Sequence, residues 1–215
     1  MMADQVLSIW KDIGMTSYDV VAAVKKKTKE RKVGHCGTLD PFADGIVLIC
    51  TGNQTKKIDS FMELDKEYIA NIVLGHETDT LDNTGIVMYQ NRNLNLNDKK
   101  IIKVLNRFKG ETYQSPPYFS ALKFKGIPLY KYARKGIFIR KKPRKIFIYD
   151  IKLLNFKDNT IQIQVKCGKG TYIRALARDI AYELGTYGSL DGLSRISLGP
   201  YNKKNSIKVG DIKNA

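Results

Sequence analysis

The sequence predicts an α+β fold in which a mixed, mostly antiparallel β-sheet is flanked by helices. Three observations support this class. Several segments repeat apolar residues at helical spacing, others alternate apolar and polar residues as half-buried strands do, and strands follow one another in hairpins instead of alternating regularly with helices. The chain has 215 residues, of which 43% are hydrophobic, so it can bury a core without disulfides or metals. We expect one domain over residues 1–215.

Helices are predicted at several places along the chain. The first begins at Thr16 or Ser17, either of which can act as its N-cap, and continues to about residue 30 with valines at helical spacing. A final helix over residues 171–184, capped by Thr171, places its apolar side chains on one stripe. Further helices are expected over residues 54–62, 98–108 and 129–134.

Strands are predicted from apolar runs and from alternation. Residues 45–50 form a continuous apolar run, which is typical of a buried central strand. The runs 145–154 and 160–167 flank the turn residues Asp158 and Asn159, so they predict a hairpin. Further strands are expected over residues 68–74 and 86–89 and at the end of residues 187–198, and the glycine-punctuated residues 33–41 are expected to form a loop.

Positive charge dominates the composition. There are 37 Lys and Arg against 21 Asp and Glu, a net charge of +16, which predicts a polyanionic partner. Residues 115–149 contain no acid and interleave cations with aromatic residues, a pattern that suits phosphates and unpaired bases. The cations expected to contact nucleic acid are Lys123, Lys125, Arg134, Lys141, Lys142, Arg144 and Lys145. A second basic run covers residues 25–32, and for both runs the alternative is a solvated surface.

Several classes of protein are disfavoured. No apolar run approaches the roughly 18–20 residues of a membrane span, and the N-terminus lacks the pattern of a secretory signal. Three cysteines without a spaced pair favour a reducing, cytoplasmic setting over a disulfide framework. No zinc spacing or nucleotide-binding glycine loop is present, so we expect neither metal nor cofactor. Glu77, Asp79 and Asp82 can hold a hard cation or simply form a solvated turn. A monomer is the default expectation.

The most informative segment for chemistry is the stretch 34–41, Gly-His-Cys-Gly-Thr-Leu-Asp-Pro. Its two glycines allow a tight turn or a close approach to a ligand. Pro41 restricts Asp40 to an extended conformation, so the sequence presents a carboxylate on a stiff turn before a buried strand. The alternative is ordinary Asp-Pro turn chemistry without catalysis.

Two other side chains draw attention. With Thr171 as the N-cap, Arg174 stands at the third helical position, where a cation faces the positive end of the helix dipole. Such a position suggests a carboxylate partner, for which Asp40 is the candidate, although an exposed arginine with a packed stem is the alternative. Tyr68 opens a strand after Lys66-Glu67, and a strand tyrosine is usually a half-buried core residue.

Taken together, these segments resemble the TruB family of tRNA pseudouridine synthases. The matches keep the family order and cover nearly the whole chain. They are Gly14-Met15-Thr16-Ser17-Tyr18-Asp19-Val20-Val21, residues 34–53, Lys66-Glu67-Tyr68, Gly75-His76-Glu77-Thr78-Asp79-Thr80, Ser115-Pro116-Pro117-Tyr118-Phe119-Ser120-Ala121-Leu122-Lys123, residues 129–136, residues 165–174 and Leu190-Asp191-Gly192-Leu193-Ser194-Arg195.

The resemblance implies a cofactor-free isomerisation of the T-loop uridine of tRNA, position 55, to pseudouridine. Asp40 would be the catalytic aspartate and attack C1′ of the ribose or C6 of the uracil. Tyr68 would stack on the flipped-out base and Arg174 would pair with Asp40. Tyr172, Leu193, His35 and Lys11 would support the substrate pocket. Residues 115–149 would be a thumb-like insertion that folds over the T stem-loop, within a pseudouridine synthase-like catalytic domain.

Some features depart from the family pattern. Asp12 stands where the family usually has proline, and Cys36 stands where it usually has threonine or serine. Asp44 stands where it usually has a small residue. Only 14 residues follow Tyr201, so we expect this chain to lack the C-terminal RNA-binding domain, of PUA type, that many members carry. Two other functions stay open. One is an RNA-guided pseudouridine synthase subunit that needs partner proteins, and the other is a non-catalytic chaperone of tRNA folding.

Overall fold

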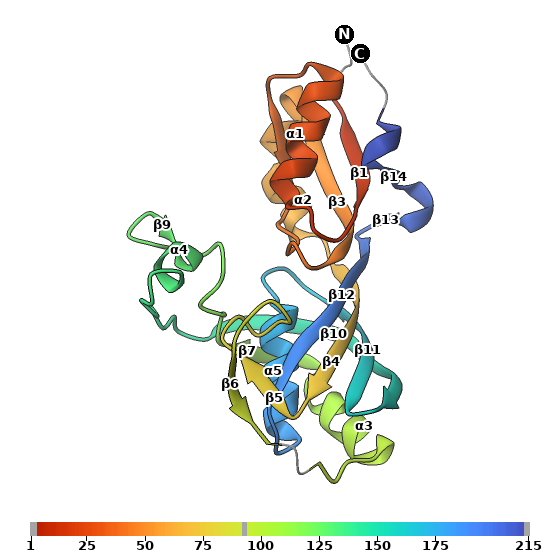
Figure 1. Cartoon of the computed structure of the whole chain (residues 1–215). Coiled ribbons are helices and arrows are strands. Elements are labelled where there is room, and N and C mark those ends of the chain that lie inside the picture. The colour runs from red at the N-terminus through yellow and green to blue at the C-terminus, as the bar shows by residue number, and fades with distance from the viewer. Residues whose placement is uncertain (1–3, 92–93, 213–215) are drawn as a thin grey trace. The chain divides into compact units, whose positions relative to one another are not determined.

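A computed structural model describes residues 4–91 and 94–212 of the chain (Figure 1). The chain divides into two compact units, residues 1–69 with 193–215 and residues 70–192. Strands β4 (Lys66–Leu74) and β12 (Gly188–Leu198) each run from one unit into the other. Most neighbouring strands are antiparallel, but β3 pairs in parallel with β12 and β1 with β14. The predicted α+β class with a mixed, mostly antiparallel sheet is therefore confirmed.

In the first unit the strand order is β14–β1–β3–β12, with β2 beside β3 and β13 beside β12. The elements are β1 (Val6–Lys11), α1 (Ser17–Thr28), β2 (Val33–His35), β3 (Asp44–Thr51), the 3₁₀ helix η1 (Gly52–Lys57), α2 (Ile58–Glu63), β13 (Tyr201–Asn202), η2 (Lys203–Asn205), β14 (Ile207–Lys208) and η3 (Val209–Asp211). The apolar run that predicted a central strand is β3, which pairs with neighbours on both sides and is buried along nearly its whole length.

The predicted start of the first helix is confirmed in detail. Thr16 is the N-cap of α1, its side chain accepts a hydrogen bond from the Asp19 amide, and the Asp19 carboxylate accepts from the Thr16 amide at 2.7 Å. This reciprocal pair is the capping box. The helix ends at Thr28, where Lys29 adopts the left-handed conformation. No element was predicted at β1, and a loop was predicted at β2; both are strands that are stabilised by pairing with β3.

In the second unit the strand order is β12–β4–β11–β10–β7, with the separate hairpins β5–β6 and β8–β9. The elements are β5 (His76–Thr78), β6 (Val87–Gln90), α3 (Asp98–Arg107), β7 (Gly110–Gln114), β8 (Lys123–Phe124), β9 (Ile127–Pro128), α4 (Leu129–Ala133), β10 (Arg144–Lys157), β11 (Thr160–Cys167) and α5 (Ile173–Glu183). The β10–β11 hairpin turns at Asp158 and Asn159, which both have positive φ, as a two-residue turn of type I′ requires.

The start of α5 differs from the prediction. The helix begins at Ile173 with Tyr172 as its N-cap, so Thr171 lies before the helix and is not its cap. The Thr171 hydroxyl instead donates a hydrogen bond to the Gly168 carbonyl at 3.1 Å. Gly170 has a φ of 75° and Tyr172 is extended, so the backbone turns into the helix later than the sequence pattern indicated. Arg174 therefore occupies the second helical position, still within the first turn.

Candidate active site

Asp40 is half-buried on the loop between β2 and β3, and that loop is anchored at several points of the first unit. The Ser17 hydroxyl of α1 accepts a hydrogen bond from the Leu39 amide at 2.9 Å and lies 3.3 Å from the Leu39 carbonyl. The Gly14 amide donates to the Pro41 carbonyl at 2.8 Å. Both neighbours of Asp40 along the chain are thus held by hydrogen bonds to other parts of the first unit.

Lys11 supports the same loop from β1. Its side chain is completely buried, and its ammonium donates to the carbonyls of Asp12 at 3.1 Å, Met15 at 2.9 Å and Ala43. Burial lowers the pKa of Lys11 to about 8, while the charges of Asp44 and Asp40 act in the opposite direction. The ammonium thus ties three backbone carbonyls together beside the Asp40 turn. Its predicted contact with substrate stays a prediction.

Arg195 is a supporting residue for which no role was predicted from the sequence. Its side chain is buried, and its Nε donates to the Ile46 carbonyl of β3 at 2.6 Å. Its terminal nitrogens reach the carbonyls of Thr38 and Gly37 at 3.5 Å. The close approach of β12 needs Gly45, because a Cβ there would lie 2.4 Å from the Arg195 carbonyl oxygen. Arg195 therefore links β12, β3 and the loop that leads to Asp40.

The other predicted site residues of the first unit lie on strands. His35 is in β2, where burial lowers its pKa and its Nδ1 has no hydrogen-bond partner among the described residues. Tyr68 and Leu193 are buried, on β4 and β12 respectively. Burial of Tyr68 is consistent both with an ordinary core residue and with a residue that lines a closed pocket. Its stacking on the uracil therefore stays a prediction.

Arg174 is held by a loop of the second unit. Its guanidinium donates to the carbonyls of Thr80 at 2.9 Å and Phe119 at 3.0 Å, and it lies 3.4 Å from the Asp82 carboxylate. Both side chains of this ion pair are almost completely buried. The exposed arginine considered as an alternative is therefore wrong. The predicted pairing of Arg174 with Asp40 stays a prediction.

The Tyr172 backbone is fixed by Gln114, another residue that the sequence did not reveal. The Gln114 side-chain oxygen accepts from the Tyr172 amide at 2.8 Å, and its side-chain nitrogen donates to the Tyr172 carbonyl at 3.1 Å. Gln114 is itself buried at the end of β7. This two-point contact holds the residue before α5 in the extended conformation that its capping position needs.

In the acidic turn, the Asp82 carboxylate forms hydrogen bonds within the turn and an ion pair with Arg174. One Asp82 carboxylate oxygen accepts from the Thr80 hydroxyl at 2.7 Å and from the Thr84 amide at 3.0 Å, and the other faces Arg174. Burial raises the pKa of the Glu77 carboxyl, which disfavours its charged form. Within residues 4–91 and 94–212 no group of three or more His, Cys, Asp or Glu is arranged to hold a metal ion.

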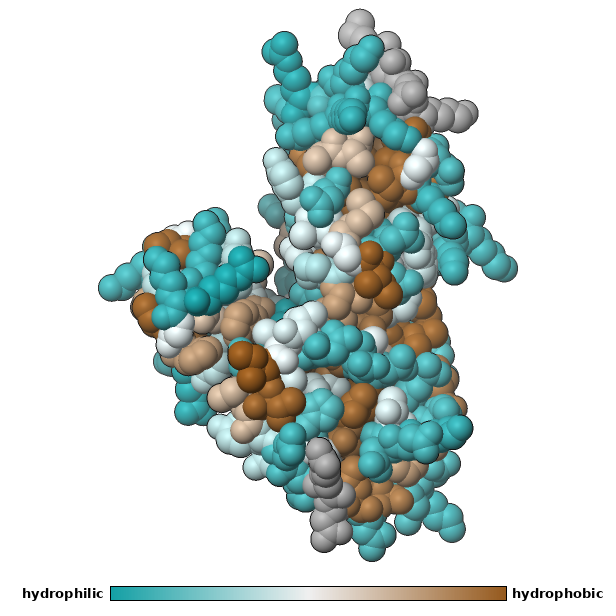
Figure 2. Space-filling view, in the orientation of Figure 1, coloured by the Kyte–Doolittle hydropathy of each residue, from teal (hydrophilic) through white to brown (hydrophobic). Residues whose placement is uncertain are grey.

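The basic segment divides into two parts. Residues 123–133, which carry β8, β9 and α4, extend away from the rest of the second unit (Figure 1), and Figure 2 shows mostly hydrophilic side chains over them. Cations that follow this stretch lie on its aromatic rings, as Lys141 does over Phe124 at 4.7 Å and Arg134 over Tyr130 at 5.4 Å. Residues 144–149 instead belong to β10 of the sheet, where Lys145 pairs with Glu111 at 2.9 Å.

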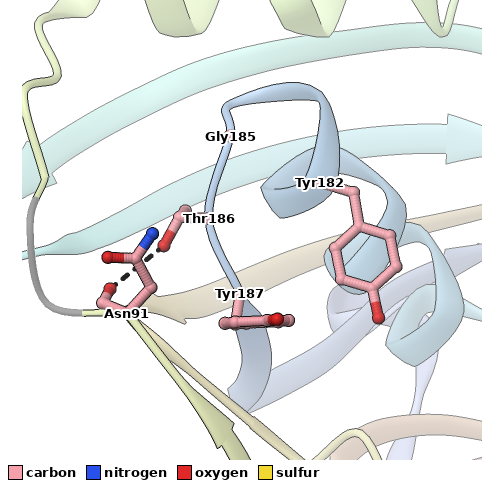
Figure 3. A pocket seen from close by; sticks show the side chains of 5 residues that line it. All are labelled: Asn91, Tyr182, Gly185, Thr186 and Tyr187. Atoms are coloured by element: carbon pink, nitrogen blue, oxygen red, sulfur yellow. Dashed lines mark hydrogen bonds between the residues drawn. The ribbon is translucent and has the colours of Figure 1, made fainter.

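A pocket of about 230 Å³ lies elsewhere in the second unit (Figure 3). It is lined by Asn91, Tyr182, Gly185, Thr186 and Tyr187, and the Thr186 hydroxyl donates to the Asn91 carbonyl at 3.3 Å. None of the side chains predicted to take part in chemistry is among its lining residues, so we do not assign the reaction to it. No helix of the described residues combines the length and apolar character needed to cross a membrane.

Comparison with known proteins gives a consistent result. Residues 25–173 match the family model described as TruB family pseudouridylate synthase, N-terminal domain. The chain is 45% identical to tRNA pseudouridine synthase B of Clostridium acetobutylicum, over 97% of this chain and 72% of the relative. It is 40% identical to the enzyme of the same name from Dehalococcoides mccartyi, over 99% of this chain and 71% of the relative.

Solved structures agree with these sequence matches. A chain in the crystal structure of a Cbf5-Nop10-Gar1 complex superposes with a TM-score of 0.75 and 28% identity. The match covers 96% of this chain and 53% of that one, so this chain spans about half of its length. A chain of an H/ACA RNP bound to a substrate RNA has a TM-score of 0.70 and 26% identity, with 96% and 51% coverage.

Proposed function

Because the chain belongs to the TruB family and is a tRNA pseudouridine synthase, we propose that it isomerises the T-loop uridine at position 55 of tRNA and that Asp40 is its nucleophile. The observation that carries the assignment of Asp40 is the anchoring of its loop. Ser17, Lys11 and Arg195 hold that loop from α1, β1 and β12. A carboxylate that must attack one atom gains rate from such fixed placement.

The reaction needs no co-reactant. Uridine becomes pseudouridine when the N1–C1′ bond breaks and a C5–C1′ bond forms, while the C5 proton is lost to solvent and N1 gains a proton. Asp40 attacks C1′ or C6 and is released again in the course of the rearrangement, so electrons and atoms balance. The target base must leave the stacked loop before attack, which costs a few kcal/mol that stacking and phosphate contacts offset.

The remaining predicted residues have roles around this step. Tyr68 stacks on the flipped uracil and assists removal of the C5 proton. Arg174 pairs with Asp40 and keeps it ionised, Tyr172 and Leu193 support the pocket, and His35 and Lys11 lie beside the target nucleotide. The cations of residues 115–149 bind the T stem-loop, with the projecting residues 123–133 as a thumb and Arg144 and Lys145 acting from β10. We further propose that the chain acts as a monomer, in the cytoplasm.

The test of Asp40 separates binding from chemistry. Asp40→Asn keeps the size of the side chain but removes its nucleophilic charge. We expect this variant to bind tRNA as the wild type does and to release no tritium from tRNA labelled at C5 of uridine. Asp59→Asn, at an exposed position of α2, is the matched control and should release tritium at the wild-type rate. Normal release by Asp40→Asn would exclude Asp40 as the nucleophile.

A guided synthase is the second candidate, and the likeness to a chain of a Cbf5-Nop10-Gar1 complex favours it. The higher identity to relatives named tRNA pseudouridine synthase B supports the first candidate. An activity assay of the purified chain alone, with an unmodified tRNA transcript as substrate, distinguishes the two candidates. Turnover without added protein or guide RNA is expected, and turnover only after their addition would favour the guided function. A tRNA-folding chaperone would give binding without turnover in both experiments.

A further inference from the structure

Three aromatic side chains gather on the outer face of the sheet edge formed by β7 and β10. Tyr113 is 67% exposed, Phe147 43% and Tyr149 47%. On β10 the side chains of Ile146 and Ile148 are buried, so Phe147 and Tyr149, which alternate with them, point to the opposite face. The rings of Phe147 and Tyr149 lie with their centroids 4.8 Å apart, yet each keeps a large exposed surface.

The strand register brings Tyr113 onto the same face. Lys145 is the direct partner of Tyr113 and Phe147 is the direct partner of Glu111, and directly paired residues project to the same side of a sheet. Lys145 also forms an ion pair with Glu111 at 2.9 Å. The aromatic rings therefore stand beside an ordered row of charged side chains, and we call Tyr113, Phe147 and Tyr149 with their flanking charges the aromatic face.

Cations outnumber acids around the aromatic face. The Lys166 ammonium lies 6.0 Å from the centre of the Tyr149 ring. Asp150 is held between Lys109 at 2.9 Å and Lys152 at 3.0 Å, and these two contacts lower its pKa to about 2. The cations are Lys109, Lys145, Lys152 and Lys166, against Glu111 and Asp150. An apolar surface bordered by excess positive charge complements a ligand that combines flat rings with negative charge.

We propose that the aromatic face is a stacking surface for unpaired bases of the RNA substrate, outside the predicted active site; this rests on the tRNA-modifying function proposed above. Exposed aromatic rings beside lysines bind single-stranded nucleic acid by stacking on bases while the cations meet phosphates. The acid-free sequence segment supplies two separate surfaces in this arrangement. Residues 123–133 form one, and Phe147 with Lys145 belongs to the other, on the sheet.

The binding test uses a fluorescein-labelled oligouridylate, which has no stable duplex. The double variant Tyr113→Ala/Phe147→Ala should bind it at least about tenfold more weakly than the wild type, the size of effect measured for removal of one stacking ring. Leu154→Ala is the matched control, because Leu154 lies on the same strand and is 45% exposed. Its affinity should equal that of the wild type. Equal affinity of the double variant would overturn the proposal and leave a protein-docking face as the explanation of the patch.

A second measurement on the wild-type chain does not depend on the folding of any variant. An oligouridylate that contains 5-iodouridine should cross-link under light to the peptide that carries Phe147 and Tyr149. Cross-links confined to residues 115–143 would overturn the proposal. Tritium release from tRNA by the same wild-type protein tests the proposed function separately, because that reaction is read at the target uridine and not at the aromatic face.

Discussion

The Arg174 guanidinium lies 3.4 Å from the Asp82 carboxylate, and the side chains of both residues are less than a tenth exposed. Thr80 and Thr84 orient the carboxylate through hydrogen bonds to its other oxygen. Removing two charges from water is unfavourable unless each finds partners, and here the ion pair and the hydrogen bonds supply them. The loop of residues 80–84 and the first turn of α5 are thereby joined, and the direction of the Arg174 side chain is fixed.

We expect Asp82→Asn to slow pseudouridine formation about 10- to 100-fold without weakening tRNA binding. The substitution removes one hydrogen-bonded charge interaction, of roughly 1.5–3 kcal/mol, that orients Arg174, and each 1.36 kcal/mol corresponds to about tenfold in rate. Single-turnover tritium release measures the rate, and filter binding measures the affinity. The control is Asp158→Asn in the exposed β10–β11 turn, where asparagine also accepts the positive φ. A wild-type rate for Asp82→Asn would show that Arg174 needs no orientation by this carboxylate.

Lys11 predicts a pH dependence of stability. Its folded-state pKa is about 8, below the ordinary value of 10.5, so between these values the unfolded chain binds more protons than the folded one. The contribution of Lys11 to the free energy of unfolding therefore increases by on the order of 3 kcal/mol as the pH rises from about 8 to about 10.5. Below about pH 8 both states carry the proton, and the penalty of burying the charge is constant.

Comparison with Lys11→Met isolates this effect from the other titrating groups. Urea unfolding of both proteins at several pH values gives the difference in their free energies of unfolding. We expect the advantage of the wild type over the variant to grow above pH 8. A difference that stays flat up to about pH 10 would mean that Lys11 titrates alike in both states. The variant also leaves the carbonyls of Met15 and Ala43 without the ammonium, so it should be less stable at every pH.

The basic residues in and after the projecting stretch 123–133 predict a salt-dependent contribution to tRNA binding, and the Lys141 ammonium lies over the Phe124 ring of that stretch. We expect the triple variant Lys125→Ala/Lys141→Ala/Lys142→Ala to weaken binding and to flatten the plot of log K against log salt. Each phosphate contact that is lost should reduce the slope by about 0.7–0.9. Fluorescence anisotropy at several salt concentrations measures both quantities.

The control for this variant removes the same charge from another surface. Lys99, Lys100 and Lys103 are exposed on α3, in the same unit. Their triple alanine variant should leave the slope nearly as in the wild type. If both variants flatten the plot equally, net charge alone governs the affinity and the thumb role of the segment is wrong.

Local patterns predicted most of the elements correctly. The capping box at Thr16 and Asp19, the apolar run of β3 and the Asp158-Asn159 turn each depend on residues a few positions apart. Such signals can be read from a single sequence because their energetics are local. The short strands β1 and β2 were missed for the opposite reason, since their hydrogen-bond partners come from β3.

The support of the candidate site was predicted least well. Asp82 looked like a candidate cation ligand or a solvated turn residue, and its partner Arg174 is 92 positions away in the chain. No sequence pattern pointed to Gln114, because its role is to form two hydrogen bonds with the Tyr172 backbone. The sequence contained a weak indication for Arg195. It is a charged residue two positions after Leu193, so it lies on the same, buried face of the strand.

The sequence by itself determined the class of fold, the family and the residues expected to carry out the chemistry. Apolar periodicity, turn residues and the order of motifs are properties of the sequence and need no tertiary structure to be recognised. Only the tertiary structure decided how those residues are held. Lys11 and Arg195 act through backbone carbonyls, which every residue has and no sequence pattern distinguishes. The Arg195–Ile46 hydrogen bond spans 149 residues. Such contacts exist only once the sheet has brought its strands together.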